Sequence, residues 1–115
     1  MPTRIYHNPR CSKSRATLAL LEENGIEAEV VEYLKEPPDA PTLASLLNKL
    51  GCDAADIVRF NEAEFAATGL SRDADARQLL DAVAQYPKLL QRPIVEHGNN
   101  ARIGRPPEAV LELFE

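Results

Sequence analysis

The segment from His7 to Arg15 gathers the residues of this chain that could do chemistry. It contains Cys11, one of two cysteines, together with the basic residues Arg10, Lys13 and Arg15, and it has no acidic residue. Positive charge favours the thiolate over the thiol, and the thiolate is the nucleophilic form of cysteine. The pattern predicts a reactive thiol at a site for a small anion. The alternatives are a small inert cysteine and a chance run of solvated charges.

The elements expected around Cys11 strengthen this prediction. Residues 3–7 favour a short strand, and residues 8–10, which include Asn and Pro, favour a tight turn. A helix should begin at Cys11 or Ser12 and end near Glu23. The free N–H groups and the dipole at the start of a helix stabilise an anion, so this position should favour the thiolate.

Two side chains near Cys11 in the sequence could tune its thiol. Ser14 follows three residues later, and its hydroxyl or backbone N–H could reach the sulfur across one helical turn. The alternative for Ser14 is plain helix surface. His7 lies four residues earlier and could pair with the thiolate or carry protons near neutral pH. The alternative for His7 is a histidine satisfied by backbone groups.

The spacing around Cys11 is CxxS, and this limits the reaction. Without a second cysteine nearby, a mixed disulfide on Cys11 needs an external thiol or a distant cysteine to resolve it. Cys52 could do so only if the fold brings the two sulfur atoms within disulfide reach, and we expect it to be a partly buried bystander. The two cysteines form no metal-ligand spacing, so the sequence predicts neither a metal nor a bound cofactor.

Three further arginines could bind a tetrahedral oxyanion. A guanidinium group matches such an anion because its N–H donors form a planar fork. The three candidates are Arg59, Arg92 and Arg105. The alternative for each is an ordinary surface charge.

The rest of the chain completes a mixed pattern of strands and helices. Residues 26–34 favour a second strand, parallel to the first because a helix connects them. A helical block should span about 40–86, with helices expected at 41–50, 53–59 and 62–67 and from Ser71 or Asp73 to 86. Strands at 92–96 and 101–103 should form an antiparallel hairpin with His97 exposed in its turn, before a last helix from Pro106.

The order β-α-β, helical insertion, β-β-α predicts an α/β, thioredoxin-like fold with a four-stranded mixed sheet. We expect one domain covering residues 1–115. The helix faces expected to be buried carry Leu18, Ala19 and Leu21 in the first helix and Val110, Leu111 and Phe114 in the last.

Length, composition and charge exclude several classes of protein. The 115 residues are 44% apolar and 27% charged, which fits a single globular domain and not a disordered chain or a disulfide-rich miniprotein. No apolar run is long enough for a membrane span, and residues 1–5 do not begin a secretory signal, so we expect a cytoplasmic protein. The net charge of −5 argues against nucleic-acid binding. We expect a monomer.

Three motifs together resemble the glutaredoxin-dependent arsenate reductase family. The most specific is residues 5–15 (IYHNPRCSKSR), and the others are residues 92–95 (RPIV) and 102–108 (RIGRPPE). Arg59, in the helical insertion, also agrees in position. The resemblance covers nearly the whole chain.

The resemblance implies a thioredoxin-like fold and an enzyme of arsenic detoxification that reduces arsenate to arsenite. Cys11 would form a covalent arseno-cysteine, which glutathione, as co-substrate, and glutaredoxin, as partner, would resolve. It implies catalytic roles for His7 and Ser14, oxyanion binding by Arg59, Arg92 and Arg105, and a cis proline at Pro93.

Two other functions stay open on the sequence. One is a glutathione-dependent reductase of protein or small-molecule disulfides, which keeps the thiol chemistry but changes the substrate. The other is a non-catalytic regulator of the Spx type that binds RNA polymerase. Those regulators typically carry CxxC, whereas this chain has CxxS together with the three arginines.

Overall fold

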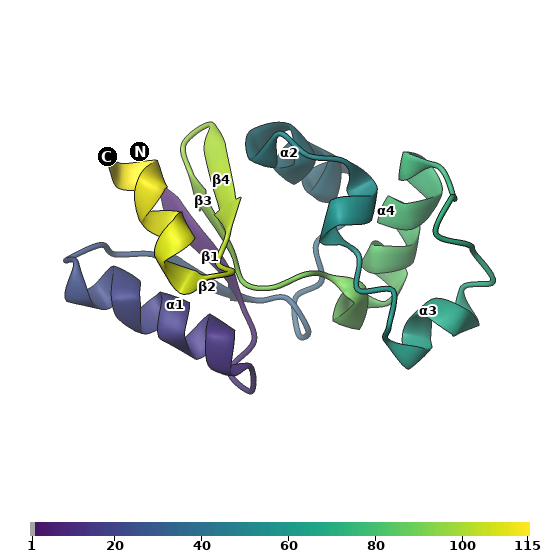
Figure 1. Cartoon of the computed structure of the whole chain (residues 1–115), viewed down its shortest axis with the longest axis horizontal. Helices are drawn as coiled ribbons and strands as arrows, with labels where there is room; N and C mark the ends of the chain where they lie inside the picture. Colours follow the sequence, from purple (N-terminus) through teal and green to yellow (C-terminus); the bar gives the residue numbers. More distant parts are fainter. Residues whose placement is uncertain (1) are drawn as a thin grey trace. The chain divides into compact units, whose positions relative to one another are not determined.

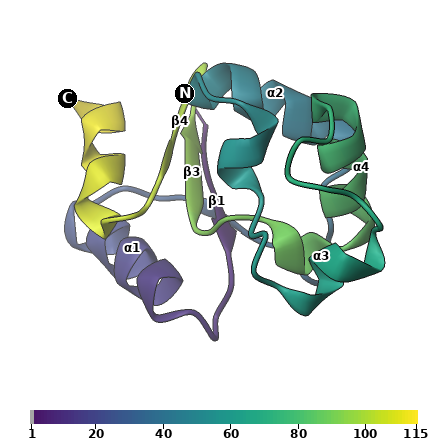
Figure 2. The same ribbon diagram turned by 45° about the vertical axis from the view of Figure 1, so that its right-hand side comes forward.

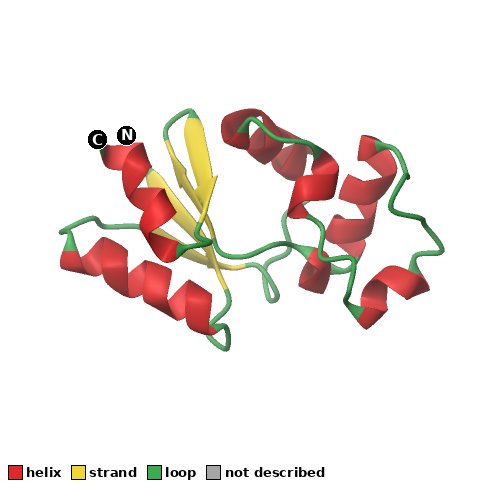
Figure 3. Cartoon of the chain, in the orientation of Figure 1, coloured by secondary structure: helices red, strands yellow, loops and turns green. Residues whose placement is uncertain are grey.

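The computed structural model describes residues 2–115 and divides the chain into two compact units. The first unit contains the chain up to Glu36 and again from Arg92 to Glu115, and the second is the inserted segment Pro37–Gln91. Figure 1 shows the course of the chain, and Figure 3 shows that the strands belong to the first unit and that the second is helical.

The first unit is built on a four-stranded mixed sheet. Its strands are β1 (Thr3–His7), β2 (Glu29–Glu32), β3 (Ile94–His97) and β4 (Asn100–Ile103), in the order β2-β1-β3-β4. β1 is parallel to β2 and antiparallel to β3, and β3 is antiparallel to β4. The helix α1 (Ser12–Glu23) makes the crossover between the parallel pair. The predicted mixed sheet and the predicted β1 are confirmed.

One face of this sheet is covered by α1 and by η3 (Pro107–Phe114), a 3₁₀-helix in the last segment of the chain (Figure 2). Ile5, Leu21, Val95 and Val110 form the core between them, each with 0% exposure. The expectation for Leu18 and Phe114 is confirmed, since both pack against this cluster.

Two details of these helices differ from expectation. Ala19 is exposed, because the buried positions of α1 are taken by the small polar residues Ser14 and Thr17 together with Leu21. The last helix is a 3₁₀-helix, whose first turn is closed by the hydrogen bond from Ala109 N–H to the Pro106 carbonyl, 3.0 Å.

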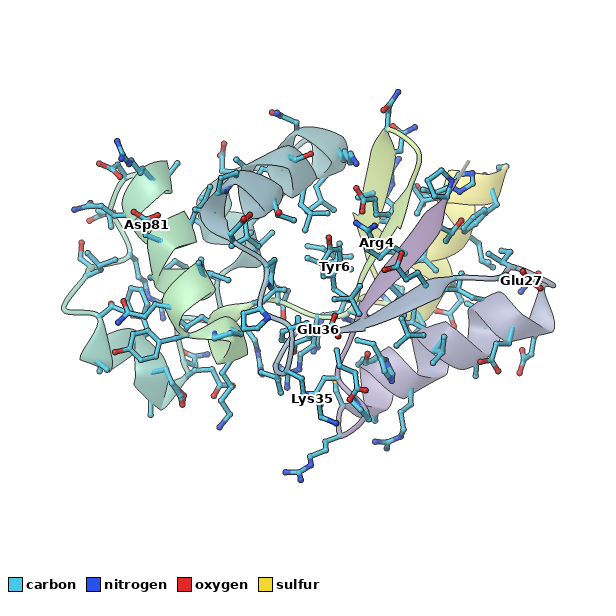
Figure 4. The ribbon with its side chains drawn as sticks, turned by 180° about the vertical axis from the view of Figure 1, so that it is seen from behind. Arg4, Tyr6, Glu27, Lys35, Glu36 and Asp81 are labelled. Carbon is cyan, nitrogen blue, oxygen red and sulfur yellow. The ribbon has the colours of Figure 1, made fainter. Side chains whose placement is uncertain are left out.

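The opposite face of β1 carries Arg4 and Tyr6, which Figure 4 labels. The Arg4 guanidinium lies 3.4 Å from the Glu29 carboxylate on β2 and 3.5 Å from the Glu96 carboxylate on β3. These cross-strand ion pairs follow the observed register, in which Arg4 stands opposite both glutamates.

The second unit consists of α2 (Ala40–Leu50), η1 (Ala54–Ile57), α3 (Ala63–Ala67), α4 (Ala76–Gln85) and η2 (Pro87–Leu89). Asp39 caps α2 by accepting a hydrogen bond from the Thr42 N–H, 2.9 Å, and Gly51 ends it in the left-handed conformation with φ 69°. Every helix of this unit contributes buried side chains, among them Leu43, Leu46, Ile57, Phe65, Leu79, Val83 and Leu89.

Two predictions about element bounds are wrong. The second strand is β2, at 29–32 and not 26–34, because β1 offers it only four partners, Arg4 to His7. The helix α4 begins after Asp75, which shares a capping box with Gln78, and not at Ser71 or Asp73. Within residues 2–115, no helix has the length and apolar character that a membrane crossing requires.

His97 is not an exposed turn residue. It ends β3, is half-buried, and its Nδ1 lies 2.8 Å from the Thr3 hydroxyl on β1. Its ring also packs on Phe114, with the ring centroids 4.7 Å apart. His97 therefore ties the end of the chain to the sheet.

Candidate active site

Cys11 is the N-cap residue of α1, as the sequence predicts. Its backbone is extended, φ −96° and ψ 122°, and its side chain makes no capping hydrogen bond. The turn before it is closed by the Cys11 N–H to the Asn8 carbonyl, 3.0 Å, and by the Arg10 N–H to the Asn8 side-chain oxygen, 3.0 Å. The turn therefore delivers a partly exposed, free thiol to the start of a helix.

The surroundings of the thiol favour negative charge. The first N–H groups of a helix lack intrahelical partners, and the first turn of α1 holds no acidic residue. Arg10, Lys13 and Arg15 are exposed around it, and the Arg15 guanidinium donates to the Pro9 carbonyl, 2.9 Å. This last bond holds a positive charge beside the turn that precedes Cys11.

His7 and Ser14 form a buried pair directly behind this turn. The Ser14 Oγ lies 2.6 Å from the His7 Nδ1, and it accepts a hydrogen bond from the Asn8 N–H, 3.0 Å. Ser14 is 0% and His7 6% exposed. Ser14 is therefore not plain helix surface. Its hydrogen bonds within residues 2–115 go to His7 and Asn8 and not to the thiol.

The hydrogen bonds of Ser14 also define the state of His7. The Ser14 oxygen already accepts from Asn8, and His7 is the remaining partner for its hydroxyl proton within residues 2–115. When the hydroxyl donates this proton to Nδ1, the ring proton of a neutral His7 lies on Nε2. Burial lowers the pKa of His7, and the nearby Arg15 lowers it further, while Glu32 opposes the change. His7 is therefore neutral at pH 7.

Arg92 and Arg105 meet at the ends of β3 and β4. The Arg105 Nε donates to the Arg92 carbonyl, 2.8 Å, and the Gly104 N–H donates to the Pro93 carbonyl, 2.9 Å. The Arg92 Nε is buried without a hydrogen-bond partner among the described residues. The peptide bond before Pro93 is cis, as the family resemblance implies, and so is the bond before Pro106.

Gly104 brings this arginine pair to α1. A β-carbon at Gly104 would lie 2.6 Å from the Thr17 Oγ1 of α1 and 2.8 Å from the Pro93 Cγ. Only glycine fits between them, because ordinary contacts of a β-carbon are longer than 3.4 Å. The structure therefore packs the neighbours of both arginines against the helix that Cys11 begins.

Arg59 and Cys52 belong to the second unit. The Arg59 Nη1 forms a 2.8 Å ion pair with the Glu62 carboxylate, and its backbone N–H donates to the Leu89 carbonyl, 2.7 Å. Cys52 is a half-buried free thiol. Burial raises the pKa of Cys52, as do the carboxylates of Asp56 and Asp53. Cys52 is therefore largely protonated at pH 7.

The sequence reasoning missed Asn8, Thr17 and Gly104 as parts of this site. Asn8 could have been found, because Asn before Pro commonly folds its side chain onto the backbone two residues on. Thr17 and Gly104 gave no local signal, since their contact joins residues 87 positions apart in the chain. The described residues contain no group of three or more His, Cys, Asp or Glu side chains placed to hold a metal ion.

The sequence matches one protein family and several proteins of known sequence. The model of the ArsC family matches residues 6–113. The chain is 52% identical to the uncharacterized protein YfgD of Escherichia coli K12, across 96% of this chain and 94% of that protein. It is 49% identical to an arsenate reductase of Neisseria meningitidis, across 93% of each.

The fold of the chain is also similar to that of a solved arsenate reductase. The structure of an arsenate reductase from Vibrio cholerae superimposes with a TM-score of 0.93 at 43% identity, and the match covers 98% of both chains. The predicted fold class, a thioredoxin-like mixed sheet with helices, is confirmed by this match and by the observed strand order.

Proposed function

Because the chain belongs to the ArsC family, we propose that it is an oxidoreductase that reduces arsenate to arsenite with Cys11 as the nucleophile. The observation that carries the proposal is the position of Cys11, a free thiol at the start of α1 in a cationic segment. The 49% identity to an arsenate reductase across 93% of this chain supports arsenate as the substrate.

The first chemical step is attack of the Cys11 thiolate on arsenic. A sulfur–arsenic bond forms and one arsenate oxygen leaves as water after it takes up protons, which gives a covalent arseno-cysteine. We assign to Arg92 and Arg105 the binding of the oxyanion and of the charge that develops on it. The hydrogen bond from the Arg105 Nε to the Arg92 carbonyl, which leaves the other guanidinium donors of Arg105 for a ligand, supports this assignment. We assign Arg59 to the same role on the family resemblance.

The second stage is reduction by thiols. Glutathione attacks the adduct, arsenic accepts two electrons and leaves as arsenite, and a disulfide forms between Cys11 and glutathione. Glutaredoxin then reduces this disulfide. The CxxS spacing supports an external thiol, because Ser14 cannot resolve a disulfide. Glutathione is thus a co-substrate and no resident cofactor is needed. We assign the reaction to a monomer in the cytoplasm.

His7 and Ser14 act as positioning residues in this proposal. Their 2.6 Å bond, together with the bond from Asn8 to Ser14, fixes the turn that presents Cys11. A neutral His7 adds no positive charge of its own, so the stabilisation of the thiolate comes from the helix start and the three basic residues.

The test is a coupled assay with glutathione, glutaredoxin, glutathione reductase and NADPH. We expect NADPH oxidation that depends on arsenate in the wild type and is lost in Cys11→Ser. Arg92→Ala and Arg105→Ala should lower the rate with arsenate, whereas Arg77→Ala, an exposed arginine on α4, should not. A wild type with a fast-alkylating Cys11 and no rate with arsenate would reject this substrate.

A further inference from the structure

A cavity of about 320 Å³ adjoins the turn that presents Cys11. It is lined by His7 and the turn residues Asn8, Pro9 and Arg10, and by three residues at and after the end of β2: Glu32, Leu34 and Lys35. Figure 4 shows Lys35 on the segment that follows β2, and all of these residues belong to the first unit. The cavity is at the lower end of the size range of small-molecule sites.

Several side chains that line the cavity can contact a ligand. Among residues 2–115, Leu34 is one of two large hydrophobic residues that are exposed, with an exposed fraction of 43%. No hydrogen bond or ion pair of the Arg10 guanidinium occurs within residues 2–115. Lys35 lies 3.7 Å from Glu32, and both side chains are exposed, so water screens this pair and it can be exchanged for ligand contacts at little cost.

The charges of the cavity complement those of glutathione. The lining offers two cations, Arg10 and Lys35, and one carboxylate, Glu32, beside the apolar side chains of Leu34 and Pro9. Glutathione carries two carboxylates and one ammonium group on a short, flexible peptide. The pairing leaves no charge of either partner unmatched, although the protein as a whole has a net charge of −5.

We propose that this cavity is the binding site of the thiol co-substrate, with the glutathione carboxylates at Arg10 and Lys35 and its ammonium group at Glu32. The inference rests on the proposed function, because it takes glutathione as the reductant. Asn8, Pro9 and Arg10, which line this cavity, form the turn that the Cys11 N–H and the Asn8 carbonyl close, 3.0 Å. Arg10 directly precedes Cys11, so a peptide held there would lie next to the turn that presents the residue carrying the adduct.

The test separates binding from turnover by using S-methylglutathione, which keeps the three charges but has no thiol. Titration of the full chain, followed by ¹H–¹⁵N NMR, should shift the resonances of residues 7–10 and 32–35. Lys35→Glu should raise the Kd about tenfold, the change expected for the loss of one contact with a charged group, and Leu34→Asp should raise it as well because it puts a carboxylate beside those of the ligand. The same variants should raise the KM for glutathione and leave the KM for arsenate unchanged.

Two matched controls are available. Val30→Asp alters the other large hydrophobic residue that is exposed among residues 2–115. Lys88→Glu alters another exposed lysine, which like Lys35 lies near a carboxylate, that of Glu64 at 3.8 Å. Neither should change the Kd. Binding that equals the controls in both cavity variants, or resonance shifts that cluster elsewhere, would overturn the proposed site even if arsenate is reduced. Specific binding without arsenate reduction would keep the site and reject the substrate.

Discussion

The two cysteines of this chain occupy opposite electrostatic environments. Cys11 lies at a helix start among basic side chains, whereas burial and the carboxylates of Asp53 and Asp56 raise the pKa of Cys52. We therefore expect iodoacetamide to label Cys11 much faster than Cys52 at pH 7. The labelled peptides can be quantified by mass spectrometry.

The pH dependence sharpens this test. The labelling rate of Cys52 should reach half its maximum at a higher pH than that of a free thiol, because burial raises the pKa of Cys52. Cys52→Ser should leave the Cys11 rate unchanged. Labelling of Cys11 at the rate of a free thiol would remove the electrostatic argument for its reactivity.

His7 gives the fold a dependence on pH. Burial, and then the charge of Arg15, lower the pKa of His7 in the folded protein, while the unfolded chain keeps the ordinary value of about 6.5. The unfolded state therefore binds more protons below that pH. Stability is fully present above pH 6.5 and falls as the pH decreases towards the folded pKa, with a slope of at most about 1.4 kcal/mol per pH unit.

Urea unfolding between pH 7.5 and 5 measures this effect. His7→Gln should flatten the pH dependence, whereas His97→Gln, which alters the other histidine, should keep it. If the pH dependence of stability persists in His7→Gln, or disappears in His97→Gln, His7 is not the residue that takes up the proton.

At the scale of single residues, the sequence predicts the position of Cys11 in the fold better than it predicts the hydrogen bonds of the neighbouring residues. The Cys11 position follows from local signals, an Asn-Pro turn and a helix start, that need no knowledge of the rest of the fold. The hydrogen bond of Ser14 to His7 was not predicted, because it depends on how the strand end and the helix pack together. The bond between Arg105 and the Arg92 carbonyl likewise forms only once β3 and β4 pair.

Among the elements, the contact between Gly104, Thr17 and Pro93 joins α1 to the ends of β3 and β4. Gly104→Ala places a methyl group 2.6 Å from the Thr17 Oγ1 and 2.8 Å from the Pro93 Cγ. Because these atoms are buried, we expect a loss of about 1–3 kcal/mol in the free energy of unfolding. The substitution should also disturb the candidate active site, because Arg92 and Arg105 are the neighbours of Pro93 and Gly104 in this contact.

A double-mutant cycle identifies the cause of that loss. Thr17→Ala removes the Oγ1 and Cγ2 atoms that the new methyl group would meet. The loss caused by Gly104→Ala should therefore be smaller in the Thr17→Ala background, with denaturant unfolding as the measurement. Equal losses in both backgrounds would show that Thr17 does not restrict position 104.

Element bounds follow the sequence where the end of an element is decided locally. The end of α1 at Asn24-Gly25 and the start of α2 at Asp39 follow from caps that are visible in the sequence. The bounds of β2 depend instead on its partner strand, and Ala28, expected in this strand, packs against the core beside β2. Pairing and packing between distant segments therefore decide the bounds that the sequence leaves open.

The whole molecule consists of a sheet-containing unit interrupted by a helical unit, Pro37–Gln91. Our prediction from the sequence is a single domain with a helical insertion at about 40–86, which means that both units should unfold together. The physical reason is that the inserted unit has a small core and is shorter than the roughly 60 residues below which a separate fold is marginal. Its ends also connect to the other unit at residues 36 and 92.

A substitution in one unit should therefore lower the stability measured in the other. Leu43 is fully buried in the helical unit, with 0% exposure, so Leu43→Ala leaves a cavity there. We expect it to lower the free energy of unfolding by about 2–5 kcal/mol. In urea titrations followed by ¹H–¹⁵N NMR, the midpoints for α1 and α4 should coincide in the wild type. Both should fall together in Leu43→Ala and in Gly104→Ala. If each substitution moves only the midpoint of its own unit, the chain is two domains, and a reactive Cys11 should then survive loss of the helical unit.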